Sequence, residues 1–171
     1  MKRILFTGPE STGKTAIAKS MSAVFQAHWV PEYARDYLAN LGRDYQYEDL
    51  LAIAKGQWQR EESMAAQAKD YLFCDTSMLV MKVWSEYRYG KCDPWILQKL
   101  KRHTYDLYIL CGIDIPWRYD PLRENPNERT ALYQIYLQEL KALGVPFSIL
   151  KGNAEERIQE CTKWIRQLHV K

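Results

Sequence analysis

GPESTGKT, residues 8–15, matches the G-x-x-x-x-G-K-[ST] pattern of a phosphate-binding P-loop at every defined position. Residues 3–7, directly before it, form a short apolar run of the kind that makes a buried strand. Apolar residues after it recur at helical spacing, at Ala16, Ile17, Met21, Val24 and Phe25. The pattern requires a strand, a loop and a helix in this order, so the sequence predicts a P-loop rather than a glycine turn with an incidental lysine.

The residues of this loop have separate tasks. Its two glycines allow the backbone to turn N–H groups inward, and the following helix directs the positive end of its dipole at a bound phosphate. We expect the ammonium of Lys14 to reach the β- and γ-phosphates of a nucleotide and the hydroxyl of Thr15 to bind Mg²⁺. The predicted phosphate-binding residues are Gly8, Glu10, Ser11, Thr12, Gly13, Lys14 and Thr15.

The composition indicates one ordered domain over residues 1–171. Hydrophobic residues make up 47% of the chain and charged residues 26%, which excludes disordered and fibrous classes. No apolar run reaches membrane-spanning length and no signal-peptide pattern precedes the first strand, so we expect a cytoplasmic protein without a membrane partner. The cysteines form no C-x-x-C pair and are interpreted as reduced thiols: Cys74, Cys92, Cys111 and Cys161.

The net charge of +3 is too small to indicate a nucleic-acid partner. A short basic cluster follows Leu97, and no basic stripe with interleaved aromatic residues continues it, so we interpret it as a solvated helix face. Its members are Lys99, Lys101, Arg102 and His103. The sequence leaves the oligomeric state open.

Apolar runs and helical periodicity alternate along the chain. Strands are predicted at residues 3–7, 27–30, 71–75, 105–111 and 146–150. Helices are predicted after the P-loop and at residues 31–41, 47–70, 78–89, 95–103 and 153–168, with Pro31 at the first helical position. Gly56 interrupts the longest helix, which indicates a close neighbour or a bend there. The alternation predicts an α/β three-layer sandwich around a five-stranded parallel sheet, the P-loop fold of nucleoside and nucleotide kinases.

Charged residues follow two of the predicted strands. Glu32 and Arg35 come just after the second strand, at the edge where open parallel sheets bind ligands. Asp75 closes the third strand in the Walker B manner and is the predicted partner of Thr15 in binding Mg²⁺. Both acids also have a simpler explanation, because Asp often forms the turn at a strand end and the helix dipole favours an acid in the first turn.

Residues 116–130 lead away from the fourth strand and are polar and proline-rich. The prolines argue against a continuous helix, and arginines can neutralise the negative charge of a transferring phosphoryl group. We therefore predict a mobile lid that carries Arg118, Arg123 and Arg129. The alternative is a solvated loop whose arginines pair with Asp120, Glu124 and Glu128.

Four segments together resemble the ribosylnicotinamide kinase domain of the NadR-type proteins. They are T-G-P-E-S-T-G-K-T at 7–15, V-P-E-Y-A-R at 30–35, D-T at 75–76 with K-V-W at 82–84, and D-I-P-W at 114–117 with L-R at 122–123. The resemblance covers essentially the whole chain, and the first two segments together are specific to the family. It implies an ATP- and Mg²⁺-dependent kinase that phosphorylates the 5′-hydroxyl of a small molecule, nicotinamide riboside, giving nicotinamide mononucleotide for NAD salvage.

In-line transfer from ATP to a hydroxyl needs a phosphate cradle, a metal, a group that orients or deprotonates the hydroxyl, and cationic charge. We assign catalysis to Lys14, Glu32, Asp75 and Arg123, with Glu32 as the first and Asp75 as the second candidate base. Arg118, Arg129 and Asn153 would complete the ATP site, although a helix cap explains Asn153 equally well. The predicted acceptor-binding residues are Glu32, Tyr33, Arg35, Gln57, Thr76, Trp84 and Tyr87.

A cationic pyridinium ring would stack favourably on Trp84, and core packing is the alternative explanation for Gln57, Trp84 and Tyr87. Two features depart from the family pattern: residue 77 is Ser where that pattern often reads D-T-D, and no H-x-G-H-type motif occurs, so adenylyl transfer is not expected. A P-loop kinase for another nucleoside or nucleoside monophosphate is the nearest alternative. A nucleotide-binding switch is an alternative of another class, disfavoured by the lack of an N-K-x-D motif and by the arginine-rich lid.

Overall fold

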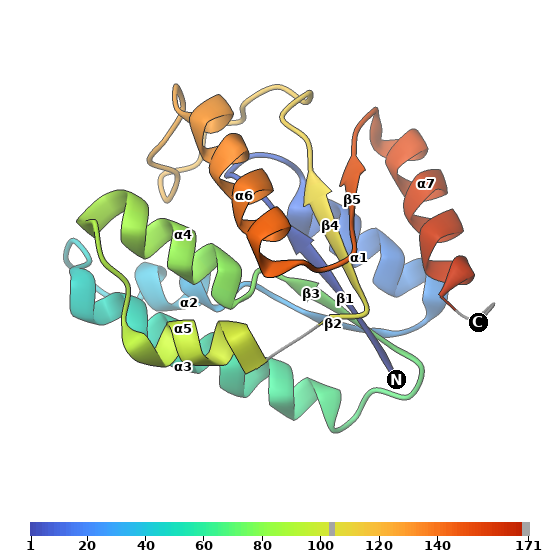
Figure 1. Cartoon of the computed structure of the whole chain (residues 1–171), viewed down its shortest axis with the longest axis horizontal. Helices are drawn as coiled ribbons and strands as arrows, with labels where there is room; N and C mark the ends of the chain where they lie inside the picture. Colours follow the sequence, from blue (N-terminus) through green and yellow to red (C-terminus); the bar gives the residue numbers. More distant parts are fainter. Residues whose placement is uncertain (103–104, 169–171) are drawn as a thin grey trace.

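The computed structural model describes residues 1–102 and 105–168, and a parallel sheet lies at its centre (Figure 1). The strands follow the order β2-β3-β1-β4-β5, and all neighbouring pairs run parallel. Their bounds are β1 (Lys2–Thr7), β2 (His28–Val30), β3 (Tyr71–Asp75), β4 (Leu107–Cys111) and β5 (Phe147–Leu150). This order puts β1 between β3 and β4, so the P-loop that follows β1 starts at the middle of the sheet.

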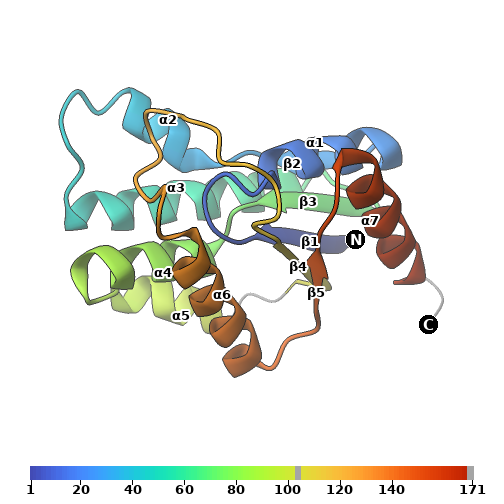
Figure 2. The same ribbon diagram turned by 90° about the horizontal axis from the view of Figure 1, so that it is seen from above.

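Helices cover both faces of the sheet, and Figure 2 gives the view from above. One face packs on α1 (Lys14–Phe25) and α7 (Ala154–Gln167). The other face packs on α2 (Tyr33–Ala39), α3 (Tyr47–Ala65), α4 (Met78–Tyr89), α5 (Pro94–Arg102) and α6 (Arg129–Leu143). The predicted three-layer fold with a five-stranded parallel sheet is therefore confirmed.

The core is divided into two parts by the strands. In β1, Leu5 packs in the cluster on the α2–α6 side, whereas its neighbours Ile4 and Phe6 pack in the cluster on the α1 and α7 side. All three side chains are fully buried. A parallel strand covered on both faces must be apolar at successive positions, which explains why these strands appear in the sequence as continuous apolar runs.

The structure corrects several predicted elements. Helix α6 was not predicted, although Leu132, Tyr136 and Leu140 are buried at a spacing of four residues. Pro31 is not the first helical residue, because α2 begins at Tyr33 with Glu32 as its N-cap. Helix α3 ends at Ala65 rather than at residue 70, and β4 begins at residue 107 rather than 105. The predicted end of a helix at His103, and that residue of the basic cluster, lie outside the described residues.

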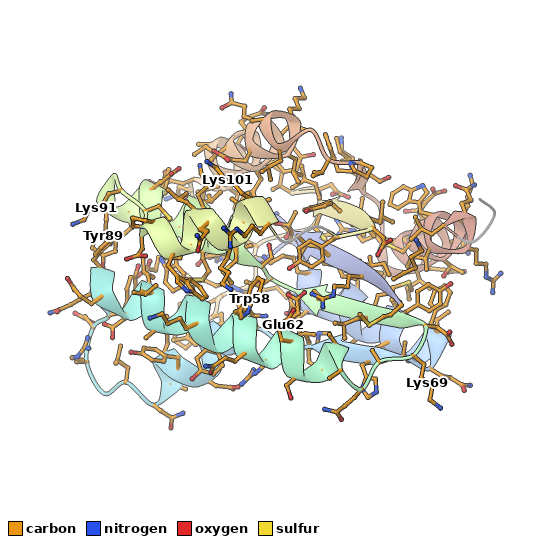
Figure 3. The ribbon with its side chains drawn as sticks, turned by 60° about the horizontal axis from the view of Figure 1, so that its bottom comes forward. Trp58, Glu62, Lys69, Tyr89, Lys91 and Lys101 are labelled. Carbon is orange, nitrogen blue, oxygen red and sulfur yellow. The ribbon has the colours of Figure 1, made fainter. Side chains whose placement is uncertain are left out.

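Helices α3 and α5 lie side by side, with Trp58 between them (Figure 3). The ammonium of Lys99 is 4.2 Å from the ring centre of Trp58, so this member of the basic cluster packs on an aromatic face rather than extending freely into water. Gly56 has the close neighbour that its sequence position indicated, because a Cβ there would lie 2.1 Å from the ring of Tyr33. The glycine allows α2 to pack directly on α3.

All four cysteines are free, as predicted, and Cys74, Cys111 and Cys161 are buried. Across residues 1–102 and 105–168, no helix combines the length and apolar character needed to cross a bilayer. No group of three or more His, Cys, Asp or Glu side chains in that same part of the chain is arranged to hold a metal ion.

Candidate nucleotide and acceptor site

The P-loop depends on backbone conformations that few side chains tolerate. Gly8 has φ +129° and Gly13 has φ +81°. A Cβ at Gly8 would also lie 3.0 Å from the carbonyl oxygen of Cys111 in β4. Both glycines of the motif are therefore required, one by backbone conformation and close packing, and the other because it starts α1 from a left-handed conformation.

Lys14 lies folded over this loop. Its ammonium donates hydrogen bonds to the carbonyl oxygens of Gly8, at 3.0 Å, and Pro9, at 2.7 Å. The hydroxyl of Thr12 donates to the Pro9 carbonyl at 2.8 Å. These contacts hold the lysine at the mouth of the loop, where the third ammonium proton can face a phosphate.

Thr15 and Asp75, the two residues predicted to bind Mg²⁺, are brought together by the pairing of β1 with β3. The Thr15 hydroxyl donates to Oδ2 of Asp75 at 2.5 Å. Oδ1 of Asp75 is buried without a hydrogen-bond partner. Burial, followed by the negative charge of Glu32, raises the pKa of Asp75 to about 6. Hard oxygen donors and a buried, unpaired carboxylate oxygen fit Mg²⁺, which takes one or two protein carboxylates together with phosphate and water.

One cavity of about 870 Å³ joins the P-loop to the second half of the site. The P-loop residues 8–15 line one end, and the lid residues Arg118 and Arg123 line its side. The lining also includes Glu32 and Arg35 after β2, and Trp84 and Tyr87 of α4. Residues from four distant parts of the chain thus meet around a space large enough for two small ligands.

Glu32 occupies the N-cap of α2, and its side chain accepts no hydrogen bond from the helix. Its carboxylate instead lies 3.5 Å from Nε of Arg35. The same guanidinium donates to Oδ2 of Asp120, in the lid, at 2.8 Å. Glu32 therefore makes no capping hydrogen bond and lines the cavity, while its place at the N-terminus of α2 agrees with the helix-dipole explanation as well.

Three residues predicted to touch the acceptor lie behind the cavity wall. Oε1 of Gln57 accepts a hydrogen bond from the backbone N–H of Tyr33 at 2.7 Å, which satisfies a free amide at the start of α2. The Tyr33 ring packs on α3, with the Arg60 guanidinium 4.8 Å from its centre. Thr76 is buried at φ +84°. In this arrangement Tyr33, Gln57 and Thr76 support the wall and do not line it.

Trp84 belongs to a chain of hydrogen bonds that the sequence did not indicate. Its Nε1 donates to the hydroxyl of Tyr45 at 2.9 Å, and that hydroxyl donates to Oε2 of Glu124 at 2.6 Å. Tyr45 comes from the loop between α2 and α3, and Glu124 from the lid. Tyr45 therefore connects the wall of the acceptor half to the lid. No local sequence signal marked it, since the contact spans 79 residues.

Residues 116–128 contain no helix or strand and run from the side of β4 toward the start of α6, on the side of β4 away from β5 (Figure 1). The lid is attached to the P-loop through the carboxylate of Glu10, which accepts from the backbone N–H groups of Glu124 and Asn125, each at 3.1 Å. The Ser11 hydroxyl accepts from the N–H of Arg118 at 2.8 Å. Glu10 and Ser11, predicted to bind the nucleotide, therefore hold the lid in this structure.

Two residues predicted for the ATP site have other contacts. The Arg129 guanidinium donates to the carbonyl oxygens of Ile113 and Ile115, at 2.9 and 2.8 Å, and does not line the cavity. Its position at the start of α6 directs it toward the chain that leaves β4. Asn153 caps α7, accepting from the N–H groups of Glu155 and Glu156, which agrees with the capping explanation.

Arg157 is a site residue that sequence analysis missed. It is 4% exposed, lines the cavity and donates to the carbonyl oxygen of Thr12 at 2.7 Å, inside the P-loop. It also donates to the Gly152 carbonyl at 2.9 Å and pairs with Asp114 at 2.9 Å. A signal was present, because Arg157 stands four residues before Cys161 on the buried stripe of α7, where an unpaired charge would be costly.

Comparison with known proteins places this geometry in a family. The model of the AAA domain family matches residues 3–157. The chain belongs to the AAA domain family. Within it, the chain is 25% identical to the trifunctional NAD biosynthesis/regulator protein NadR of Salmonella typhimurium and 24% identical to NadR of Escherichia coli. Each alignment covers 98% of this chain and 43% of the relative, so the chain spans less than half the length of these curated relatives.

Solved structures with the same fold include NadR and a nucleoside kinase. A NadR structure in complex with NAD and AMP-PNP aligns with a TM-score of 0.80 at 20% identity, over 98% of this chain and 49% of that one. A NadR complex with NR gives 0.81 at 19% identity, over 99% and 52%. Deoxyadenosine kinase from M. mycoides with bound dCTP gives 0.61 at 13% identity, over 96% and 99%. At these identities the likeness establishes the P-loop kinase fold of this AAA domain.

Proposed function

We propose that this chain is an ATP- and Mg²⁺-dependent kinase that phosphorylates the 5′-hydroxyl of nicotinamide riboside to give nicotinamide mononucleotide. The observation that carries the proposal is the continuity of the cavity. Lys14, Thr15 and Glu32 all line this one cavity, so a phosphate donor and a hydroxyl acceptor can meet within it.

The P-loop end fits the triphosphate. Backbone N–H groups at the start of α1 and the ammonium of Lys14 supply positive charge to the phosphate oxygens. Thr15 and Asp75 would hold the Mg²⁺, with Oδ1 of Asp75 free to do so. When bound there, the ion neutralises negative charge that develops on the phosphate oxygens during transfer.

The acceptor end fits a hydroxyl that attacks in line. Glu32 can accept a hydrogen bond from the 5′-hydroxyl and take its proton as the new O–P bond forms, while the bond from the γ-phosphorus to the β–γ bridging oxygen breaks and ADP leaves. Arg35 fixes the orientation of Glu32 through its contact at 3.5 Å. The lid excludes water, and it places Arg118 and Arg123 on the cavity wall, where they can balance charge on the transferring group.

The choice of nicotinamide riboside rests on the aromatic wall. Trp84 and Tyr87 supply aromatic rings to the cavity lining, and Tyr45 and Glu124, which are hydrogen-bonded to each other, line the same cavity. Such a wall favours a ring that carries positive charge, as the pyridinium of this nucleoside does. The likeness to NadR, whose structure is known in complex with NR, supports the same choice.

A kinase for another nucleoside is the second candidate, favoured by the fold that the chain shares with deoxyadenosine kinase. The discriminating experiment is a panel of acceptors assayed with ATP, with and without Mg²⁺. It contains nicotinamide riboside, nicotinic acid riboside, the common nucleosides and their monophosphates. Selective turnover of the pyridine ribosides is the expected result. Preference for another nucleoside would reject the substrate, and slow ATP hydrolysis that no acceptor changes would reject the kinase in favour of a switch.

A further inference from the structure

Tyr136 places a buried phenol on the wall of the cavity. It lies on α6, and Leu132, one turn before it, also lines the cavity. Tyr136 is only 4% exposed. The position of α6 is set by an ion pair to α4, in which Lys82 contacts Glu139 at 2.6 Å. Helix α6 thus holds Tyr136 in the lining of the same cavity as the P-loop and Glu32.

Among residues 1–102 and 105–168 the Tyr136 hydroxyl has no hydrogen bond, and its oxygen is not one of the fully buried unpaired atoms, so it is accessible from the cavity that Tyr136 lines. Burial, together with the negative charges of Glu32 and Glu10, raises the pKa of Tyr136 far above its usual value. The phenol therefore keeps its proton throughout the working pH range. A protonated phenol on the cavity wall can donate a hydrogen bond to an acceptor atom of a bound ligand. The two carboxylates are close enough for their charges to act on it.

The cavity lining already contains groups that can bind the phosphates and the ring of the two ligands. Lys14 and the backbone N–H groups of the P-loop can bind phosphates, and Trp84 and Tyr87 can stack on a flat ring. A nucleoside whose ring lies on α4 and whose 5′-hydroxyl lies at Glu32 must place its sugar between them. Val80, Val83 and Leu132 also line the cavity, and their apolar side chains cannot hydrogen-bond a sugar hydroxyl.

We infer that Tyr136 is an acceptor-binding residue whose phenol donates a hydrogen bond to a ribose hydroxyl oxygen of the nucleoside. This inference rests on the proposed function, because it requires a nucleoside in the acceptor half. It adds to that function the residue that recognises the sugar. The hydrogen bond from Tyr136 favours acceptors with a complete ribose over their deoxy analogues. The hydroxyl completes its hydrogen bonding only when the substrate is bound.

The test is Tyr136→Phe, measured with the best acceptor of the wild-type panel and with its 2′-deoxy and 3′-deoxy analogues. We expect the KM for the ribonucleoside to rise about tenfold, which corresponds to the loss of one hydrogen bond between neutral groups. The KM for ATP should not change. For the analogue that lacks the contacted hydroxyl, wild type and variant should have equal KM values, because the interaction is already absent.

Two further measurements separate this role from a structural one. Within the described residues the Tyr136 hydroxyl makes no hydrogen bond, so Tyr136→Phe, which keeps the packed ring, should unfold at the wild-type temperature or above it in the absence of substrate. Tyr133→Phe, on the same helix but outside the cavity lining, is the matched control and should leave both KM values unchanged. The inference would be overturned if Tyr136→Phe raised the KM equally for the ribonucleoside and for both deoxy analogues, or if it changed the KM for ATP alone.

The outcome also distinguishes this inference from the proposed function. A wild-type protein that phosphorylates no nucleoside rejects both. A wild-type protein that phosphorylates a nucleoside, with Tyr136→Phe equal to it on every acceptor, rejects the role of Tyr136 and leaves the kinase standing.

Discussion

The guanidinium of Arg157 donates a hydrogen bond to the carbonyl oxygen of Thr12 at 2.7 Å, joining α7 to the P-loop across 145 residues of sequence. The same side chain holds the carbonyl of Gly152 and the carboxylate of Asp114. Arg157 therefore fixes the P-loop against the ends of β4 and β5.

We expect Arg157→Met to weaken ATP binding about tenfold or more, because the loop loses the contact that fixes its shape. It should also destabilise the fold by roughly 2–4 kcal/mol, since Asp114 and three carbonyl oxygens lose a buried donor. Calorimetric titration with ATP and thermal unfolding measure the two effects. Arg166→Met, at an exposed position of α7, is the control. Wild-type ATP affinity in Arg157→Met would show that the loop holds its shape alone.

Lys14→Ala should lower kcat by at least about a hundredfold, because the variant lacks the positive charge that the transferring phosphate meets. The fold should persist, since the hydrogen bonds that the Lys14 ammonium donates within the described residues go to the carbonyls of Gly8 and Pro9 in its own loop. Steady-state kinetics at saturating ATP, with circular dichroism to check the fold, make the comparison. Lys163→Ala on the exposed side of α7 serves as the control. Near-native turnover in Lys14→Ala would remove the P-loop from the mechanism.

Glu32→Gln separates catalysis from helix stability. The side chain makes no capping hydrogen bond, so the substitution should change the unfolding temperature little. If Glu32 takes the proton of the acceptor hydroxyl, kcat should fall about a hundredfold or more while the affinity for ATP stays the same. Asp36→Asn, an exposed acid of the same helix, controls for the loss of negative charge. An unchanged kcat combined with a lower unfolding temperature would assign Glu32 to the helix instead.

The parts of the site that could be predicted are those that a local pattern specifies. The P-loop lies within eight consecutive residues, and the alternation of apolar runs with helices was enough to predict the parallel sheet. The pairing of Thr15 with Asp75 followed from the fold, because Asp75 ends β3 and Thr15 lies in the first turn of α1, which the P-loop connects to the neighbouring strand β1.

The parts that could not be predicted depend on contacts between distant segments. Arg157 and Tyr45 owe their places to partners 145 and 79 residues away, which no spacing in the sequence reveals. Arg129 carries the expected charge, but its position at the start of α6 turns it toward the backbone of Ile113 and Ile115. Failure to recognise α6 also hid Tyr136, since its helical neighbours at 132 and 140 were not read as one face.

Tyr45→Phe tests whether the lid and the acceptor wall act together. The variant loses the bonds to Glu124 and Trp84, so we expect a several-fold higher KM for the acceptor. Glu124→Gln should have a similar effect. The double variant should lose less acceptor-binding free energy than the two single variants together, because both changes remove the same hydrogen bond between Tyr45 and Glu124. Tyr47→Phe, outside the cavity lining, is the control. Fully additive effects would mean that the two residues act independently.

Glu61 gives the substrate-free protein a dependence of stability on pH that is unrelated to catalysis. Its carboxyl is 2% exposed, accepts from the Tyr105 hydroxyl at 2.9 Å and lies 3.3 Å from the Arg3 guanidinium. Burial outweighs these contacts and raises the pKa of Glu61 to about 7, from 4.5.

Because the folded pKa is raised, the folded protein binds this proton more tightly than the unfolded chain does. The stabilisation is fully present below pH 4.5 and is lost as the pH rises through about 7. Between pH 4.5 and pH 8 the loss is on the order of 2–3 kcal/mol. Glu61→Gln keeps the neutral form, so its unfolding temperature should fall less than that of wild type between these pH values. Glu62→Gln, at the next position and more exposed, should keep the wild-type slope. If the unfolding temperatures of wild type and Glu61→Gln changed in parallel with pH, Arg3 would already keep the Glu61 carboxylate ionised in the folded protein.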